Sequence, residues 1–138
     1  MSEPSLPAWY GALPRFAFGD GPALADELLA LVVSGRKTAT CTTPDGPALS
    51  RPGARWVVTD GRGRPACVIE TTEITIRRYD EVDAAFAHDE GEGDRSLESW
   101  RQAHRRYFER QGKFAERMLL VCERFRLIEV FGGRGAAP

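Results

Sequence analysis

A lysine and a threonine three residues apart, Lys37 and Thr40, are the residues whose types and spacing favour joint chemistry. A threonine hydroxyl becomes a nucleophile when a neighbouring base takes its proton, and an ammonium group stabilises developing negative charge. A turn or short strand at this point would aim both groups into one cleft. The structural alternative is a helix C-cap, because positive charge is favourable at the end of a helix.

An amphipathic helix is expected directly before this pair. Apolar residues recur at helical spacing between Pro22 and Ser34. Proline suits the first turn of a helix, and Gly35 suits the left-handed position after the last turn. We therefore expect a helix over residues 22–34, with Lys37 and Thr40 in the segment that leaves it.

The remaining patterns predict the α+β class. Strands are expected over 55–59, 66–76 and 119–128, where β-branched and apolar residues gather, and the first two should form a hairpin. Helices are expected over 83–89 and after Ser96, which suits an N-cap. The order α, β, β, α, α, β predicts a small barrel with flanking helices.

Composition and charge exclude several classes of protein. With 42% hydrophobic and 28% charged residues, the chain of 138 residues is an ordinary globular domain. A net charge of −1 argues against coating nucleic acid by bulk attraction, although acids gather in residues 80–94 and arginines in 95–126. No apolar run is long enough to span a bilayer, and the start lacks the pattern of a secretory signal. The three cysteines are odd in number and widely spaced, so we expect reduced thiols and a cytoplasmic protein.

The segment after the first helix resembles the signature of the ASCH domain family, a PUA-like family, which is Gly-x-Lys-x-x-Thr after an amphipathic helix. Gly35, Lys37 and Thr40 fill this signature. The resemblance continues through Glu-Gly-Glu-Gly-Asp-Arg-Ser-Leu at 90–97 and Cys-Glu-Arg-Phe at 122–125. The chain is thus identified as a member of the ASCH family.

The resemblance implies a small PUA-like β-barrel with flanking helices over residues 16–130. Residues 1–15 would be a loose N-terminal extension and 131–138 a flexible tail. The partner implied is RNA or a modified nucleoside, with no membrane and no cofactor. The ribonuclease relatives, which act with a divalent metal, leave such a metal open as an alternative. No oligomeric state is implied.

Three functions follow from the family. Some relatives are described as ribonucleases that cleave single-stranded RNA, others as amidohydrolases that deacetylate 4-N-acetylcytidine, and others only as RNA binders. The long Glu-Gly-Glu-Gly-Asp loop is more similar to the RNA-cleaving members. We therefore expect an RNA-binding hydrolase that cleaves single-stranded RNA, with the amidohydrolase second and a non-catalytic RNA-binding module third.

The amidohydrolase relatives imply the catalytic roles. Lys37 would be the base, Thr40 the nucleophile and Glu90 the proton donor, with Glu92 as the alternative carboxylate. A lysine beyond a helix C-terminus is favoured in its charged form, which suits stabilisation of an oxyanion or phosphorane better than general-base catalysis. Glu90, Glu92 and Asp94 lack the spacing of a metal loop, so we assign no metal ligands and expect a solvated acidic loop.

The binding residues expected around this centre fall into three groups. The turn itself supplies Gly35, Arg36 and Thr38. Glu70 is expected to face the cleft floor and pair with Lys37, because an unpaired buried carboxylate is costly. Arginines would contact phosphates and an aromatic residue would stack on a base, the candidates being Arg95, Arg101, Arg105 and Trp56. Packing roles are expected for Cys41, Trp100 and His104, whereas His88 is a candidate acid-base accessory.

Overall fold

The computed structural model describes residues 11–45 and 51–131 of the chain. The predicted loose ends, 1–15 and 131–138, lie largely outside these residues. Along the chain the elements are β1 (Arg15–Phe16), α1 (Pro22–Val33), β2 (Ala39–Thr42), β3 (Arg55–Thr59), β4 (Pro65–Arg78), the 3₁₀ helix η2 (Tyr79–Glu81), α2 (Ala84–Glu90), α3 (Leu97–Arg110) and β5 (Leu119–Val130). The predicted helices and long strands are confirmed. Strand β1 was not predicted, and at β2 the sequence left a turn or a short strand open, because two and four residues are too few to give an alternating pattern.

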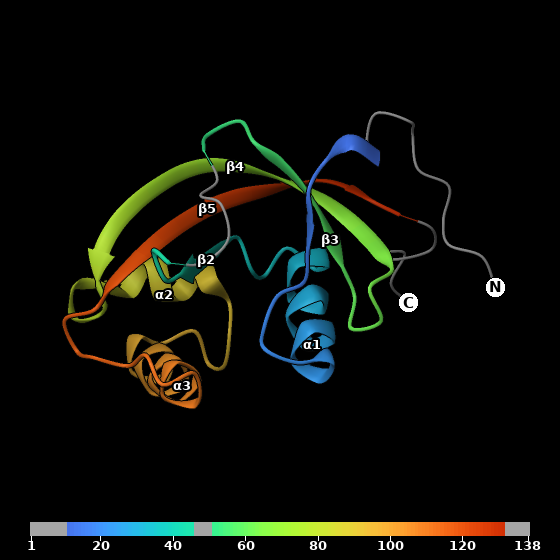
Figure 1. Cartoon of the computed structure of the whole chain (residues 1–138). Coiled ribbons are helices and arrows are strands. Elements are labelled where there is room, and N and C mark those ends of the chain that lie inside the picture. The colour runs from blue at the N-terminus through green and yellow to red at the C-terminus, as the bar shows by residue number, and fades with distance from the viewer. Residues whose placement is uncertain (1–10, 46–50, 132–138) are drawn as a thin grey trace.

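The five strands form one sheet in the order β1-β3-β4-β5-β2, antiparallel except for the pairing of β1 with β3. Strands β4 and β5 are long and arch over the helices (Figure 1). Register shifts near Ile69 and Thr71 mark bulges, which bend a strand and increase its twist. The α+β class is confirmed, but the predicted small barrel is not, because the sheet is not closed. In the described part of the chain, the short strands β1 and β2 are the two open edges of the sheet.

Local sequence explains where the helices begin and end. Helix α1 has proline in its first turn and is followed by Gly35 at φ +82°, a left-handed conformation that favours glycine. Asp83 caps α2 through the amide of Phe86, and Ser96 caps α3 through the amide of Ser99. Among the described helices, none is long and apolar enough to cross a membrane.

The helices cover the concave side of the sheet at two places (Figure 1). Helix α1 packs against β3 and β5 with a core that includes Leu28, Val58 and Phe125. Helices α2 and α3 pack against η2, β2 and the start of β5, with a core that includes Phe86 and Phe108. Because these two cores lie apart under one curved sheet, side chains from both reach the space between them.

Candidate functional site

A cavity of about 670 Å³ lies between the two cores and has walls from α1, β2, α3 and β5. Its aromatic lining comprises Phe16, Phe18, Trp56, Trp100, Tyr107 and Phe125. Its polar lining includes Lys37, Thr40, Glu90, Glu92 and His104. The volume is typical of a pocket for one small molecule, so this cavity is the candidate site of binding and reaction.

The floor of this pocket is an ion pair centred on Lys37, whose side chain is only 1% exposed. Its Nζ donates to Glu90 Oε1, Glu92 Oε2 and the carbonyl oxygen of Ala39, each at 2.8 Å. Burial alone would lower the pKa of Lys37, but the charges of Glu90 and Glu92 outweigh it and raise the pKa. The sequence did not decide between Glu90 and Glu92 as the functional carboxylate. In the structure both bond the lysine, which is held as a cation.

Glu90 is the most densely bonded carboxylate of the pocket and is also 1% exposed. Its second oxygen, Oε2, accepts from Trp100 Nε1 at 2.9 Å and lies 3.3 Å from His104 Nε2. Burial would raise the pKa of Glu90, yet the charges of Lys37 and His104 lower it far below its usual range. Glu90 is therefore an anion in the free protein, which is the opposite of what a resting proton donor requires.

His104 connects α3 to this ion pair. Its Nδ1 lies 2.9 Å from the carbonyl oxygen of Trp100, which can only accept, so Nδ1 carries a proton. Its Nε2 faces Glu90, and the ring stacks on Trp100 at 4.2 Å between centroids. Burial would lower the pKa of His104, but Glu90 raises it above its usual value. The expected packing role of His104 is correct, but its place in the polar centre was not predicted.

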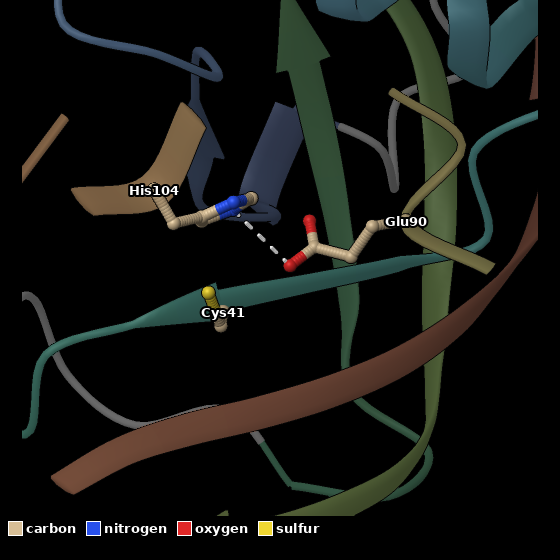
Figure 2. A group of neighbouring side chains, drawn as sticks. All are labelled: Cys41, Glu90 and His104. Carbon is tan, nitrogen blue, oxygen red and sulfur yellow. Dashed lines mark ion pairs between the residues drawn. The ribbon is translucent and has the colours of Figure 1, made fainter. Parts of the chain in front are cut away.

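Thr40 and Cys41 bring β2 to the pocket wall. Both side chains are half-buried and line the cavity. Figure 2 shows Cys41 on β2, Glu90 at the end of α2 and His104 on α3 grouped together, and their ligand atoms lie within 4.8 Å of one another. Burial, with the charge of Glu90, raises the pKa of Cys41 well above its usual value, so the thiol is protonated. Thr40 and Cys41 thus place a hydroxyl and a thiol in the wall of the pocket that contains the ion pair.

The signature turn and the end of α2 are joined by direct hydrogen bonds. The amide of Thr38 donates to the carbonyl oxygen of Asp89 at 2.7 Å, Lys37 Nζ to that of Glu90 at 3.3 Å, and Arg36 Nε to that of Gly91 at 2.8 Å. A Cβ at Gly91 would lie 2.3 Å from the carbonyl oxygen of Arg36, and its φ is +74°. Glycine is therefore required where the two segments meet.

Several predicted binding residues lie elsewhere. Glu70 does not pair with Lys37: it binds Arg55 at 2.9 Å and Arg126 at 3.1 Å, its cross-strand neighbours on β3 and β5. These arginines lower the pKa of Glu70, chiefly through the hydrogen bond from Arg55. The expected position of Glu70 at the cleft floor is therefore wrong, because its strand register points it to a surface ion-pair network.

The arginines at the pocket differ from those predicted. Arg106 and Arg110 on α3 line the cavity, together with Arg15 on β1. Arg101 and Arg105, on the same helix, do not line the cavity, and Arg105 lies over the ring of Phe114 at 4.8 Å. The helical spacing of the arginines was clear in the sequence, but the face of α3 that meets the pocket was not.

The other expected residues take mixed positions. Trp56 lines the pocket, as a stacking residue would. Arg95 donates from Nε to the carbonyl oxygen of His88 at 3.0 Å and supports the loop after α2. His88 itself is 58% exposed and does not line the pocket. Asp94 accepts from the amide of Ser96, so it belongs to the start of α3.

Comparisons with known proteins agree with this architecture. The ASCH domain family matches residues 14–129. The ASCH domain of Lactobacillus crispatus JV V101 is 35% identical, with a TM-score of 0.77 over 86% of this chain and 81% of that one. Protein EF3133 of Enterococcus faecalis V583 is 34% identical, with a TM-score of 0.75 over 85% of this chain and 77% of that one.

A more distant likeness concerns the fold alone. The ASCH protein of Zymomonas mobilis is 15% identical, with a TM-score of 0.57 over 87% of this chain and 71% of that one. Among curated proteins, none matches the chain significantly. The family match over most of the chain and the two solved structures above 30% identity agree with the PUA-like fold. The chain therefore belongs to the ASCH domain family, whose members are thought to bind RNA.

Proposed function

We propose that the chain is a hydrolase that takes one base of an RNA or a free nucleoside into the pocket and removes an acyl group from the exocyclic amine of that base. The observation that carries this proposal is the buried Lys37, bonded to Glu90 and Glu92 at 2.8 Å each, at the floor of an aromatic-lined cavity. Single-stranded RNA is commonly recognised by stacking unpaired bases on aromatic side chains. An amide on a bound base would then meet the polar floor.

The charge of the floor favours an uncharged group there. The ammonium group of Lys37 and the ring of His104 face the carboxylates of Glu90 and Glu92, so groups that carry opposite charges oppose each other across the floor. A phosphate would meet the two carboxylates at close range, whereas Arg106 and Arg110 line the pocket without belonging to this cluster. The base end of a nucleotide therefore suits the floor, and the phosphate end suits these arginines.

The reaction can be written with these groups. The hydroxyl oxygen of Thr40 attacks the amide carbon, the hydroxyl proton passes to Lys37, and the amine of the base leaves with a proton from Glu90. Water then hydrolyses the ester on Thr40 and releases the carboxylic acid formed from the acyl group. Lys37 and Glu90 need their neutral forms for this step. One proton transfer across the 2.8 Å contact between Nζ and Oε1 converts the ion pair into an amine and a carboxylic acid. The raised pKa of the lysine makes these forms a minority in the free protein.

Cleavage of single-stranded RNA is the second candidate. It is favoured by Arg15, Arg106 and Arg110, which line the pocket, and of these Arg110 is already paired with Asp20 at 3.1 Å. A cationic Lys37 would also stabilise a phosphorane. Against this reading, Lys37 is 1% exposed and already bonded to two carboxylates.

The test is a paired assay with purified protein, using 4-N-acetylcytidine in one arm and labelled single-stranded RNA in the other. The variants are Lys37→Ala and Thr40→Val, and Lys113→Ala is the matched control, because Lys113 is exposed and binds Asp45 instead. Release of acetate that is lost in the first two variants and kept in the control would support the amidohydrolase. Lysine-dependent RNA fragments without acetate release would overturn it in favour of the ribonuclease. Inactivity in both arms, with RNA still bound, would leave a binding module.

A further inference from the structure

Cys41, Glu90 and His104 come from three separate elements and meet at one point of the pocket wall. Figure 2 shows the three side chains directed toward a common space, and one ligand atom of each lies within 4.8 Å of the other two. All three residues also line the cavity. A sulfur, an oxygen and a nitrogen donor are therefore placed around one volume that opens to a ligand-sized pocket.

The histidine is held as metal-binding histidines are held. In such sites one ring nitrogen binds the metal, while the other donates its proton to a carboxylate, a water or a backbone carbonyl. Here Nδ1 of His104 bonds the carbonyl oxygen of Trp100 at 2.9 Å, which directs Nε2 at Glu90. The ring also stacks on the Trp100 indole at 4.2 Å between centroids, which limits its rotation.

The spacing of the donor atoms suits a tetrahedral ion. With metal–ligand bonds of about 2.0–2.1 Å, two nitrogen or oxygen ligands of a tetrahedral zinc lie about 3.3 Å apart. The measured distance between His104 Nε2 and Glu90 Oε2 is 3.3 Å. A zinc–sulfur bond of about 2.3 Å places sulfur about 3.6 Å from the other two ligands. The thiol of Cys41 lies within 4.8 Å of them, so it has to move by at most about 1.2 Å toward each to reach this spacing.

We propose that Cys41, Glu90 and His104 form a binding site for Zn²⁺, with the fourth position of the tetrahedron open to the pocket. A thiolate, an imidazole and a carboxylate are ligands that zinc accepts, whereas Mg²⁺ and Ca²⁺ prefer oxygen alone. Three protein ligands with one open position is the arrangement of reactive zinc sites, and structural sites use four. This inference concerns metal binding and does not rest on the proposed hydrolase reaction, in which Glu90 donates a proton: a Glu90 bound to zinc cannot take that role, so the reaction belongs to the zinc-free site.

The surrounding charges accommodate the ion. Zinc would take the place of the proton between His104 and Glu90 and of the thiol proton of Cys41, so two positive charges leave as the ion enters. Lys37 binds the other oxygen of Glu90, Oε1, and keeps its 2.8 Å contact. Trp100 Nε1 bonds Oε2 at 2.9 Å, and a carboxylate oxygen can accept this bond and bind a metal at the same time. The net charge of the site is thus unchanged by zinc.

The experiment is a titration of the chelator-treated, full-length protein with Co²⁺, followed by displacement with Zn²⁺. Cobalt reports its own coordination: a thiolate ligand gives a near-ultraviolet charge-transfer band, and tetrahedral geometry gives intense visible bands. We expect one Co²⁺ per chain with both signals, and their loss when zinc is added. Cys41→Ser should abolish the charge-transfer band. His104→Gln should weaken binding of the metal by at least about tenfold.

Matched controls are available within the chain. Cys122→Ala removes the cysteine opposite Cys41 on β5, and His88→Gln removes the histidine outside the pocket. Both should bind Co²⁺ like the unchanged protein, and circular dichroism will show which variants are folded. Weak octahedral spectra, or tetrahedral binding that survives Cys41→Ser, would overturn the proposal. Because the readout is spectroscopic, an absence of hydrolysis would leave this result unaffected.

Discussion

Replacing Lys37 with methionine tests whether the ion pair holds the pocket floor together. The change removes the cation that contacts Glu90 and Glu92 at 2.8 Å each, while keeping a long side chain. Removing one partner of a buried pair costs about 3–5 kcal/mol, since the other charge stays buried without its counter-charge. Glu90 keeps its contacts with Trp100 and His104, and Glu92 is 23% exposed and can turn to water. We therefore expect a loss near the lower limit, about 3 kcal/mol.

The measurement is urea denaturation followed by circular dichroism, with the free energy of unfolding taken by linear extrapolation. Lys113→Met is the matched control, because Lys113 is the other lysine of the chain, is 40% exposed, and should change stability little. The double variant Lys37→Met with Glu90→Gln removes both charges of the Lys37–Glu90 pair. It should therefore recover about 1 kcal/mol or more of the free energy of unfolding lost in Lys37→Met. If Lys37→Met destabilises the protein no more than Lys113→Met does, the ion pair does not support the floor and the argument fails.

Two further predictions concern His104 and the arginines of α3. In the presence of a chelator, His104→Gln should cost more stability at about pH 6 than at about pH 9. Burial lowers the pKa of His104, but Glu90 raises it overall, so the pKa is higher in the folded than in the unfolded protein. The charged ring therefore stabilises the fold fully below its unfolded pKa of about 6.5. This stabilisation is lost as the pH rises through the folded pKa. Equal losses at both pH values in urea denaturation would contradict this. Replacing Arg106 and Arg110 with glutamine should weaken single-stranded RNA binding and reduce the slope of log K against log salt by about 1.4, whereas the Arg101 and Arg105 double variant should change it less.

Much of the fold could be predicted because its signals are local. The helix from Pro22 ends within one residue of its predicted end, since the glycine that terminates it is visible in the sequence. The strand at 55–59 follows from its composition. The N-cap at Ser96 follows from a hydroxyl that stands directly before the helix. Closure of the sheet could not be judged in this way, because it depends on how edge strands pair across the whole molecule.

The sequence could predict which distant residues meet in the candidate site only where the family resemblance named them. Lys37 and Glu90 are 53 positions apart, and no local pattern joins them. Glu70 was misplaced because its strand register with Arg55 and Arg126 is decided by pairing and bulges in β4. The spacing of Trp100 and His104, four residues apart, correctly predicts that both side chains project from one side of α3, but it does not indicate that His104 meets Glu90 there.

The hydrogen bonds between the signature turn and the last carbonyl groups of α2 have a consequence for folding. A helix leaves its final carbonyl oxygens without partners within the helix, and α2 is only seven residues long. Residues 36–38 supply donors to these oxygens, and two of the three carry positive charge toward the negative end of the helix dipole. Two segments about fifty residues apart in the chain thus complete one helix end. Of these donors only Lys37 is a signature residue, because Arg36 and Thr38 fill variable positions of Gly-x-Lys-x-x-Thr, so Lys37 has a structural role at α2 in addition to its place in the pocket.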